Sequence, residues 1–431
     1  MISKTKFLAL IYCLVITSVG FTQRNSTPQA ATIEVHFDKV LVTPHTSPVD
    51  SSLAPLIGFL HSQPDTSLWN KFVKPLKPNF WRNKDYYNEY HLKALKYNPN
   101  FHYQMSLGGG YPAYKKEASH PYWPTNDYSK WQDFRTNKMK NIPSDIKNFS
   151  IDIWNEPNHK TYWPGSDSTF FEMFCETLSW LNTEYPEYPI AGPSSTGTTS
   201  RQFVDDLIQF MRRWKLRNPE KKLTLNTLAV HGLGQSHEDF LTDLIYLSNK
   251  VNSKQWSDLG INSIIYNEYL RSHESNSFSW SLKKLEAFEK YGVEYAARAC
   301  WGTCQNGSLD GILIEDANGG YNTTENWFGY AVYSLMTGKR HITKNDSDLA
   351  TISAEREDGS KIILIANPQI GPEVHLTLKL PSSSVNSWNI YQITDDGIKL
   401  VSSKSTNNIS ISIAKRESYL VSEKSISDFR E

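Results

Sequence analysis

The stretch "SIDIWNEPNHKTYW", residues 150–163, decides how this chain folds. Ile151 and Ile153 are separated by one polar residue, which is the period-two pattern of a short strand. Pro157 has no backbone N–H to donate to a neighbouring strand, so the strand must end before it. Glu156 is thereby placed at the carboxyl end of a strand, which is where α/β folds usually carry their chemistry.

Short apolar runs alternate with longer helical patterns between residues 54 and 338. The predicted strands are "LIGFL", "VKPLKPNFW", "FHYQMSL", "SIDIWNE", "YPIAGP", "LNTLAVHG", "SIIYNEY" and "EYAARACW". One predicted helix follows a capping box formed by Thr169 and Glu172, and another ends at Gly292 as its C-cap. Eight such alternations predict a (β/α)8 barrel rather than a doubly wound sheet. "SLGGGYP" lacks the GxGxxG spacing of a nucleotide site and indicates a sharply bent loop.

The pattern changes after "NWFGYAVYSLMTGKR", which we expect to be the last helix, closed by Gly338. The segments "ATISAERE", "SKIILIANP", "EVHLTLKLP", "SWNIYQIT" and "NISISIAKRESYLVS" alternate with period two and are separated by turn residues. They predict an antiparallel β-sandwich over residues 340–425. Residues 31–50 alternate in the same way, and we expect them to join that sandwich. A structural buttress for the barrel is its expected role, and separate sugar binding is the alternative.

The composition bounds the class of protein. A chain of 431 residues is long enough for one large domain and a smaller one. Lys and Arg together number 45, as do Asp and Glu, so no general attraction to nucleic acid or anionic membranes is indicated. The 13 Trp and 23 Tyr are many for this length, and aromatic rings can stack on sugars as well as pack cores.

The first 24 residues have the pattern of a secretory signal. Lys4 and Lys6 precede an apolar run over residues 7–21, which is short for a membrane span of about 20 residues. We therefore expect a secreted or periplasmic protein without a membrane span after signal removal. An uncleaved anchor is the alternative.

Three cysteines follow the signal segment. Cys175 lies on the apolar face of a predicted helix and is expected to be a small core residue. Cys300 and Cys304 are close enough in sequence to pair, but "CWGTC" lacks the spacing and the histidines of a zinc site. We expect no metal and no cofactor.

A second acidic residue occupies a similar position. "INSIIYNEYL" places Glu268 where another strand ends, 112 residues after Glu156. That separation leaves room for three βα units, so the two residues belong to strands four and seven and face one bowl. Such a pair suits glycosidic bond cleavage, in which one carboxyl is protonated and the other ionised, and an ionised neighbour raises the pKa of its partner. The alternative is that each is an ion-paired or solvated strand-end residue.

"IDIWNEPN" resembles the acid/base signature of retaining glycoside hydrolases built on (β/α)8 barrels. "WNEPN" is most similar to glycoside hydrolase family 39, which contains β-xylosidases and α-L-iduronidases. The resemblance covers the barrel and extends to the C-terminal sandwich, and "WFGYAVYSLMTG" resembles the family's final helix. It implies that Glu156 is the general acid/base, that Asn155 binds the sugar 2-hydroxyl and that Glu268 is the nucleophile.

The resemblance extends to two further residues and also has gaps. It implies that His231 in "LAVHG" lies near the nucleophile and that Arg82 in "NFWR" supports the nucleophile's ionised form. The family usually has Thr before the nucleophile and an aromatic–Asn pair after it, whereas this chain has "YNEYL". "VHGLG" also lacks the usual aromatic residue two positions past the histidine. These departures leave the sugar open.

Aromatic residues complete the predicted site. Trp301, after the eighth strand, is expected to form a platform beneath the first sugar. Trp163 lines the leaving-group side together with Tyr162, or else the two pack a loop. Tyr266 lies two residues before Glu268, hence on the same face of a regular strand, where it can hydrogen-bond a carboxylate. Asn267 and Tyr269 should then point away unless the strand kinks.

These observations predict a retaining glycoside hydrolase that acts on the ends of oligo- or polysaccharides, with a β-xyloside as the default substrate. Arabinofuranosides, uronides, glucosides and other plant or algal glycans are the alternatives within that class. A carbohydrate-binding protein that has kept the barrel without turnover, and a transglycosylase, are the alternatives outside it.

Overall fold

The computed structural model describes residues 28–44, 52–60, 68–83, 88–109, 129–234, 236–299, 308–368, 373–381 and 387–426. The predicted signal segment 1–24, Trp301, Cys300 and Cys304 lie outside these ranges. Within them, no helix is both long enough and apolar enough to cross a membrane.

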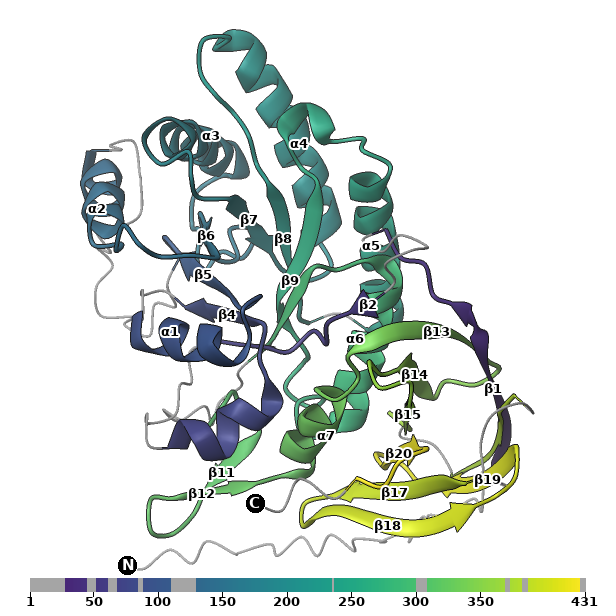
Figure 1. The fold of residues 1–431 in the computed structure, drawn as a ribbon. Helices are drawn as coiled ribbons and strands as arrows, with labels where there is room; N and C mark the ends of the chain where they lie inside the picture. Colours follow the sequence, from purple (N-terminus) through teal and green to yellow (C-terminus); the bar gives the residue numbers. More distant parts are fainter. Residues whose placement is uncertain are drawn as a thin grey trace, which may run out of the picture.

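Eight parallel strands form a nearly closed barrel in which each strand pairs with the next along the chain (Figure 1). They are β3 (Gly58–Phe59), β4 (Phe80–Asn83), β5 (His102–Ser106), β6 (Phe149–Asp152), β7 (Ile190–Ser195), β8 (Thr227–Gly232), β9 (Ser263–Tyr269) and β10 (Tyr295–Arg298). The first and last of these lie side by side. A Cβ at Gly58 would collide with the carbonyl oxygen of Ala296, so glycine permits this close approach.

Helices connect the strands and surround them. In chain order they are α1 (Asn88–Tyr97), α2 (Ser129–Lys140), α3 (Asp167–Glu184), α4 (Ser200–Arg217), α5 (His237–Asn252), α6 (Phe278–Tyr291) and α7 (Glu325–Tyr333). Short helical turns η2 (Trp69–Val73) and η3 (Lys74–Leu76) stand between β3 and β4, η4 (Ser257–Leu259) precedes β9, and the hairpin β11 (Leu313–Glu315) and β12 (Tyr321–Thr323) precedes α7. The helix faces and the strands share one large apolar core.

Helix ends test the predicted caps. Gly292 adopts the left-handed conformation (φ 71°) after α6, which confirms the predicted C-cap. The capping box at Thr169 is wrong, because Ser166 is the N-cap of α3 and its hydroxyl accepts a hydrogen bond from the Thr169 N–H at 3.2 Å. Gly338 does not close the last helix either: α7 ends at Tyr333, and Gly338 begins the next strand.

The remaining strands form a separate, mostly antiparallel sheet. Its members are β1 (Gln29–Val40), β2 (Ser52–Leu53), β13 (Gly338–Asn345), β14 (Ala350–Glu355), β15 (Lys361–Ala366), β16 (Val374–Lys379), β17 (Trp388–Thr394), β18 (Gly397–Lys404), β19 (Asn408–Ile413) and β20 (Ser418–Ser422). The order is β18-β17-β20-β15-β14-β13-β1-β16-β19, with β2 on β13. Strand β1 pairs antiparallel with β13 and parallel with β16.

This sheet curls over a core of its own. Phe37 of β1 and Trp388 of β17 stack with ring centroids 6.2 Å apart, although their strands are far apart in the sheet order. Apolar side chains of β1, β16 and β19 share one cluster with those of β15, β17 and β20. The two halves thus pack face to face as in a sandwich, although hydrogen bonds make them one continuous sheet.

The outer face of the same sheet rests on the barrel. Ile352 of β14 and Leu364 of β15 belong to the barrel's apolar core, and both strands contact α6. A buried ion pair adds to this contact, because Nε of Arg340 lies 2.7 Å from a carboxylate oxygen of Glu289 on α6. The Tyr333 hydroxyl donates a further hydrogen bond to Glu289 at 2.6 Å. Barrel and sheet are therefore joined by apolar and polar contacts.

Candidate active site

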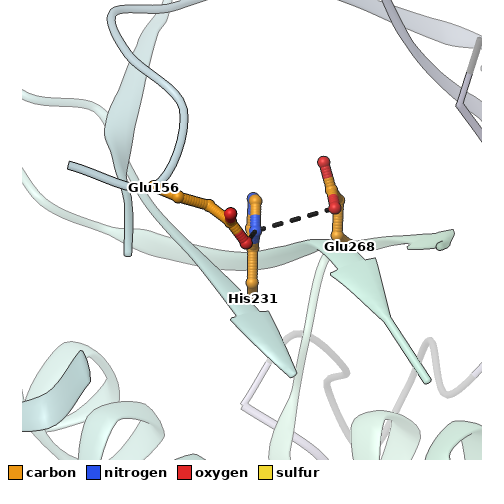
Figure 2. Close-up of side chains that lie close together, drawn as sticks. All are labelled: Glu156, His231 and Glu268. Atoms are coloured by element: carbon orange, nitrogen blue, oxygen red, sulfur yellow. Dashed lines mark hydrogen bonds and ion pairs between the residues drawn. The ribbon is translucent and has the colours of Figure 1, made fainter. Parts of the chain in front are cut away.

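Three side chains from the carboxyl ends of three barrel strands lie close together (Figure 2). Glu156 follows β6, His231 lies on β8 and Glu268 on β9. One potential ligand atom of each lies within 4.8 Å of those of the other two. The two glutamates, far apart in the sequence, thus face the same point.

The backbone around Glu156 is held in an unusual conformation. Glu156 has φ 47°, in the left-handed region that non-glycine residues rarely adopt. Its N–H donates to the carbonyl of Ser194 at 3.0 Å, which ties it to the end of β7. Gly109, in the loop predicted to bend sharply, has φ 73° and lies against the backbone of Asn155, where a Cβ would collide. Close packing of two loops fixes where Glu156 points.

An irregularity in β9 decides which side chains enter the barrel. Val230 of β8 is level with Tyr266, but His231, the next residue, is level with Glu268. The extra residue, Asn267, turns inward, and its Nδ2 donates to Oε1 of Gln104 at 2.9 Å. Asn267 and Glu268, which are consecutive in β9, therefore both point towards the barrel interior, as happens at a β-bulge.

The same irregularity makes the prediction for Tyr266 wrong. The Tyr266 ring packs against Phe240 of α5 and Phe288 of α6, with centroids 5.6 and 4.8 Å away. It therefore lies on the outer face of β9, behind the site, and contacts neither glutamate. The argument that Tyr266 shares a face with Glu268 assumed a regular strand, which β9 is not.

Arg82 of β4 connects the parts of the site. Its Nη1 lies 2.6 Å from Oε1 of Glu268, and its Nη2 donates to Oδ1 of Asn155 at 2.8 Å. On the other side, Nε and Nη2 donate to Oδ2 of Asp152 at 3.2 and 2.7 Å. Burial lowers the pKa of Arg82, but the carboxylates around it outweigh this and raise that pKa. Arg82 is thus a permanent cation between two acidic side chains.

A buried polar cluster beneath the site was not predicted from the sequence. It is formed by Asp152, Ser194 and Asn267, and we call it the barrel floor. Oδ2 of Asp152 accepts hydrogen bonds not only from Arg82 but also from the Ser194 hydroxyl at 2.8 Å and from Asn267 Nδ2 at 3.2 Å. Asp152 is fully buried. The signal was present in the opening stretch: if Ile151 and Ile153 face the helices, then Asp152 must face the barrel interior.

Glu156 and Glu268 have different neighbours. Nδ1 of His231 lies 3.0 Å from Oε1 of Glu156 and 3.8 Å from Oε2 of Glu268. Burial raises the pKa of Glu156, but the hydrogen bond and charge of His231, with the charge of Arg82, outweigh it, so that pKa is lowered. The predicted rise in the pKa of Glu156 is therefore wrong, because His231 and Arg82 favour its ionised form.

Two predicted aromatic contacts have different outcomes. Trp163 is buried, packs edge-on against Trp154 and Phe170, and donates its indole N–H to the carbonyl of Ser166 at 2.9 Å. It therefore packs the loop after Glu156, which was the alternative to a substrate contact. The predicted platform Trp301 lies outside the described residues.

The donor set could hold a metal ion on geometry alone. Within the described part of the chain, Glu156, His231 and Glu268 are the one group of such residues close enough to share an ion. The guanidinium of Arg82, 2.6 Å from Glu268, opposes a second positive charge there. The arrangement suits proton transfer and nucleophilic attack better than metal binding.

The chain matches no protein-family model. Its fold is similar to that of a protein from Neocallimastix frontalis at TM-score 0.67 and 19% identity, covering 91% of this chain and 99% of that one. A glucosidase from Croceicoccus marinus matches at TM-score 0.61 and 12% identity, covering 92% and 100%. A family 39 glycoside hydrolase from Xanthomonas axonopodis pv. citri matches at TM-score 0.61 and 12% identity, covering 94% and 99%.

Other solved structures of this shape include glycoside hydrolases of families 44 and 51. The likeness spans both the barrel and the second sheet, because nine-tenths of the chain is covered. At such low identity it establishes the fold and not the family. The chain therefore has the two-part architecture, a parallel barrel with an attached β domain, of glycoside hydrolases from families 39, 44 and 51.

Proposed function

We propose that this protein is a glycoside hydrolase that retains the anomeric configuration, with Glu268 as nucleophile and Glu156 as general acid/base. One observation carries the proposal: oxygens of the two carboxylates lie within 4.8 Å of each other, one beside a guanidinium and the other beside an imidazole. Two carboxyl groups in different surroundings over one point are what glycoside cleavage requires.

The short gap favours retention over inversion. Retaining enzymes hold their carboxyl groups about 5–5.5 Å apart, whereas inverting enzymes leave about 6.5–9.5 Å for a water molecule. The carboxylate oxygens of Glu156 and Glu268, within 4.8 Å of each other, are closer to the first spacing than to the second. This supports direct attack on the sugar by Glu268.

In the proposed first step, a carboxylate oxygen of Glu268 bonds to the anomeric carbon and the bond to the leaving oxygen breaks. Glu156 gives its proton to that oxygen. In the second step Glu156 takes a proton from water, which attacks the same carbon and releases Glu268. Arg82 holds the carboxylate of Glu268 in its orientation between turnovers.

Substrate binding is proposed for residues around this pair. Asn155 accepts from Arg82 through Oδ1, so its NH2 group is left to donate to the sugar 2-hydroxyl. Trp301 is proposed as the platform beneath the first sugar. The proposal also includes a secretory signal over residues 1–24, a catalytic barrel over 54–338, and a β domain formed by 31–50 and 340–425. The protein would thus act outside the cytoplasm.

Terminal β-xylosides are the first substrates to test. A family 39 member from Caulobacter crescentus is described as a β-xylosidase, and a family 51 member from Xanthomonas axonopodis pv. citri as an arabinofuranosidase. The Croceicoccus marinus protein is described as a glucosidase. Xylosides, arabinofuranosides, glucosides and uronides therefore form the panel.

The decisive experiment incubates the wild type, Glu268→Gln and Glu156→Gln with nitrophenyl glycosides of this panel and with plant and algal oligosaccharides. We expect hydrolysis by the wild type, loss of turnover with an intact fold in Glu268→Gln, and first release of the substrate's own anomer in NMR spectra. Initial release of the opposite anomer would contradict retention. A wild type that binds sugars but cleaves none of them would instead indicate a binding protein.

A further inference from the structure

We infer that Asp152 is a positioning residue for the proposed reaction: it anchors Arg82 and offsets its charge, so that Arg82 orients Glu268 without immobilising it. The inference rests on the proposed function. Asp152 touches neither glutamate in the described contacts and acts only through Arg82.

The geometry places Asp152 at the centre of the barrel floor. Its Oδ2 accepts hydrogen bonds from Arg82 of β4, Ser194 of β7 and Asn267 of β9. Asp152 itself lies on β6, so one oxygen joins four of the eight strands. Asn267 is also bonded to Gln104 of β5 and to the Ser194 hydroxyl, each at 2.9 Å. The floor is therefore a connected network that fixes the position of Arg82.

The charges give Asp152 a second role. Arg82 has carboxylate oxygens at 2.7 Å from Asp152 and at 2.6 Å from Glu268, on different nitrogens. In a buried site a cation paired with one carboxylate alone attracts it strongly. A nucleophile bound in that way is stabilised before it reacts, and its attack is slowed. Because Asp152 shares the cation, Glu268 keeps its orientation and more of its reactivity.

Two other titratable groups among the described residues act on Arg82 or Glu268. They are Glu156, after β6, and His231, on β8. Asp152 is thus the acidic group that offsets the charge of Arg82 from the barrel floor, whereas the two glutamates lie on the side of the proposed site.

A pair of substitutions separates charge from shape. Asp152→Asn keeps an oxygen for the donors around Oδ2 and removes the negative charge. The other oxygen, Oδ1, is buried without a hydrogen-bond partner, so the new NH2 group displaces no existing bond. Ser195→Ala is the matched control, because it removes a buried hydroxyl at the end of β7 that bonds Ser200 and not Asp152. Asp152→Ser is a second variant in case Asp152→Asn does not fold.

The expected result for Asp152→Asn is a fall in kcat of about 10- to 100-fold, by analogy with the loss of a partner that orients a metal ligand. KM should change little, since Asp152 does not touch the sugar. The acidic limb of the pH–rate profile should move to lower pH, because an uncompensated guanidinium favours ionised carboxylates. Ser195→Ala should stay within about threefold of the wild type, because it removes one neutral hydrogen bond outside the Asp152 network.

Arg82→Met provides the test of mechanism. If Asp152 acts through Arg82, then adding Asp152→Asn to Arg82→Met should lower kcat no further, which is a non-additive cycle. Additive losses would assign Asp152 a purely structural role and overturn the inference. Wild-type kinetics and an unshifted pH profile in Asp152→Asn would also overturn it.

A separate measurement distinguishes failure of this inference from failure of the proposed function. An activated 2-deoxy-2-fluoro glycoside should form a covalent adduct on Glu268 of the wild type, seen by mass spectrometry of peptides. If the wild type is labelled and active, the function stands and only the variants decide the role of Asp152. If the wild type is neither labelled nor active on the glycoside panel, the proposed function fails first.

Discussion

Nδ1 of His231 lies 3.0 Å from Oε1 of Glu156, and this contact sets the direction in which the pKa of Glu156 moves. Burial by itself would raise that pKa. The imidazole reverses the effect because its hydrogen bond and charge favour the ionised carboxylate. The pKa of the proposed general acid, Glu156, is therefore lowered by His231 on β8.

His231→Leu should move the basic limb of the kcat/KM profile to higher pH. Without the imidazole, burial dominates and the pKa of Glu156 rises, so the acid stays protonated to higher pH. Substrate hydrolysis measured across pH checks this. His375→Leu is the control, because His375 bonds Ser412 in the second sheet, far from the site. A basic limb that stays in place in His231→Leu would count against the proposed pairing.

Glu156→Ala should affect substrates according to their leaving groups. Loss of a general acid costs about 10²–10⁴-fold where the departing oxygen needs a proton. Dinitrophenyl glycosides need little protonation, so their first step should be nearly unaffected and a burst of phenol should appear. Stopped-flow measurement of that burst, with an alkyl glycoside for comparison, checks the role. Equal losses on both substrates would assign Glu156 a different task.

The start of α7 carries a pH-sensitive group. Burial raises the pKa of Glu325 to about 7, and the charges of Asp395 and Glu417 contribute, although the Ser418 hydroxyl donates to it. A carboxyl whose folded pKa lies above its unfolded value contributes stability at low pH, and loses it as pH rises from about 4.5 to about 7.

Glu325→Gln should therefore raise the free energy of unfolding at pH 8 by about 1–3 kcal/mol and change it little at pH 4. Thermal melts at the two pH values check the difference. Glu220→Gln, a substitution at an exposed position, is the control and should show no such dependence. Equal stabilisation at both pH values would mean that the charge of Glu325 is not the cause.

Lys284 on α6 offers a fourth test. It is buried, its Nζ lies 3.6 Å from the centroid of the Phe240 ring, and burial lowers its pKa to about 8. The unfolded chain binds the proton up to about pH 10.5, so stability rises as pH goes from about 8 to about 10.5. Lys284→Met should stabilise the protein by about 1–3 kcal/mol at pH 7, because it removes a buried charge.

This advantage of Lys284→Met should shrink as pH rises towards 10, and denaturant titrations at several pH values would follow it. Lys290→Met, on the last turn of the same helix, is the matched control. Destabilisation by Lys284→Met at pH 7 would show that the ring contact with Phe240 outweighs the cost of burying the ammonium.

Much of the barrel could be predicted because its strands are buried on both sides. Each of the eight predicted strands overlaps a strand of the barrel, as expected when parallel strands form nearly continuous apolar runs. The second predicted strand, "VKPLKPNFW", was too long, because its residues 73–76 lie in helical turns. In the second sheet, β18 was missed because most of its side chains are exposed and show no alternation. The first residues of β13, 338–340, were taken as the end of a helix.

The site was harder to predict than the fold. Strand ends placed Glu156 and Glu268 near each other, since the carboxyl ends of parallel strands meet at one edge. The family resemblance added His231 and Arg82 to them. Tyr266 failed because a single inserted residue changes which side chains face inward, and nothing in "YNEY" marks the insertion. Asp152 was overlooked because a buried acid is recognised by its partners, and those come from other strands.

Strand β1 lies between β13 and β16, yet it ends at Val40 while they begin at Gly338 and Val374. During synthesis it emerges from the ribosome long before either neighbour exists. An unpaired strand with an apolar face is prone to pair with other chains. The second sheet can therefore be completed only in the last quarter of translation, and until then β1 has an apolar face without its partner strands.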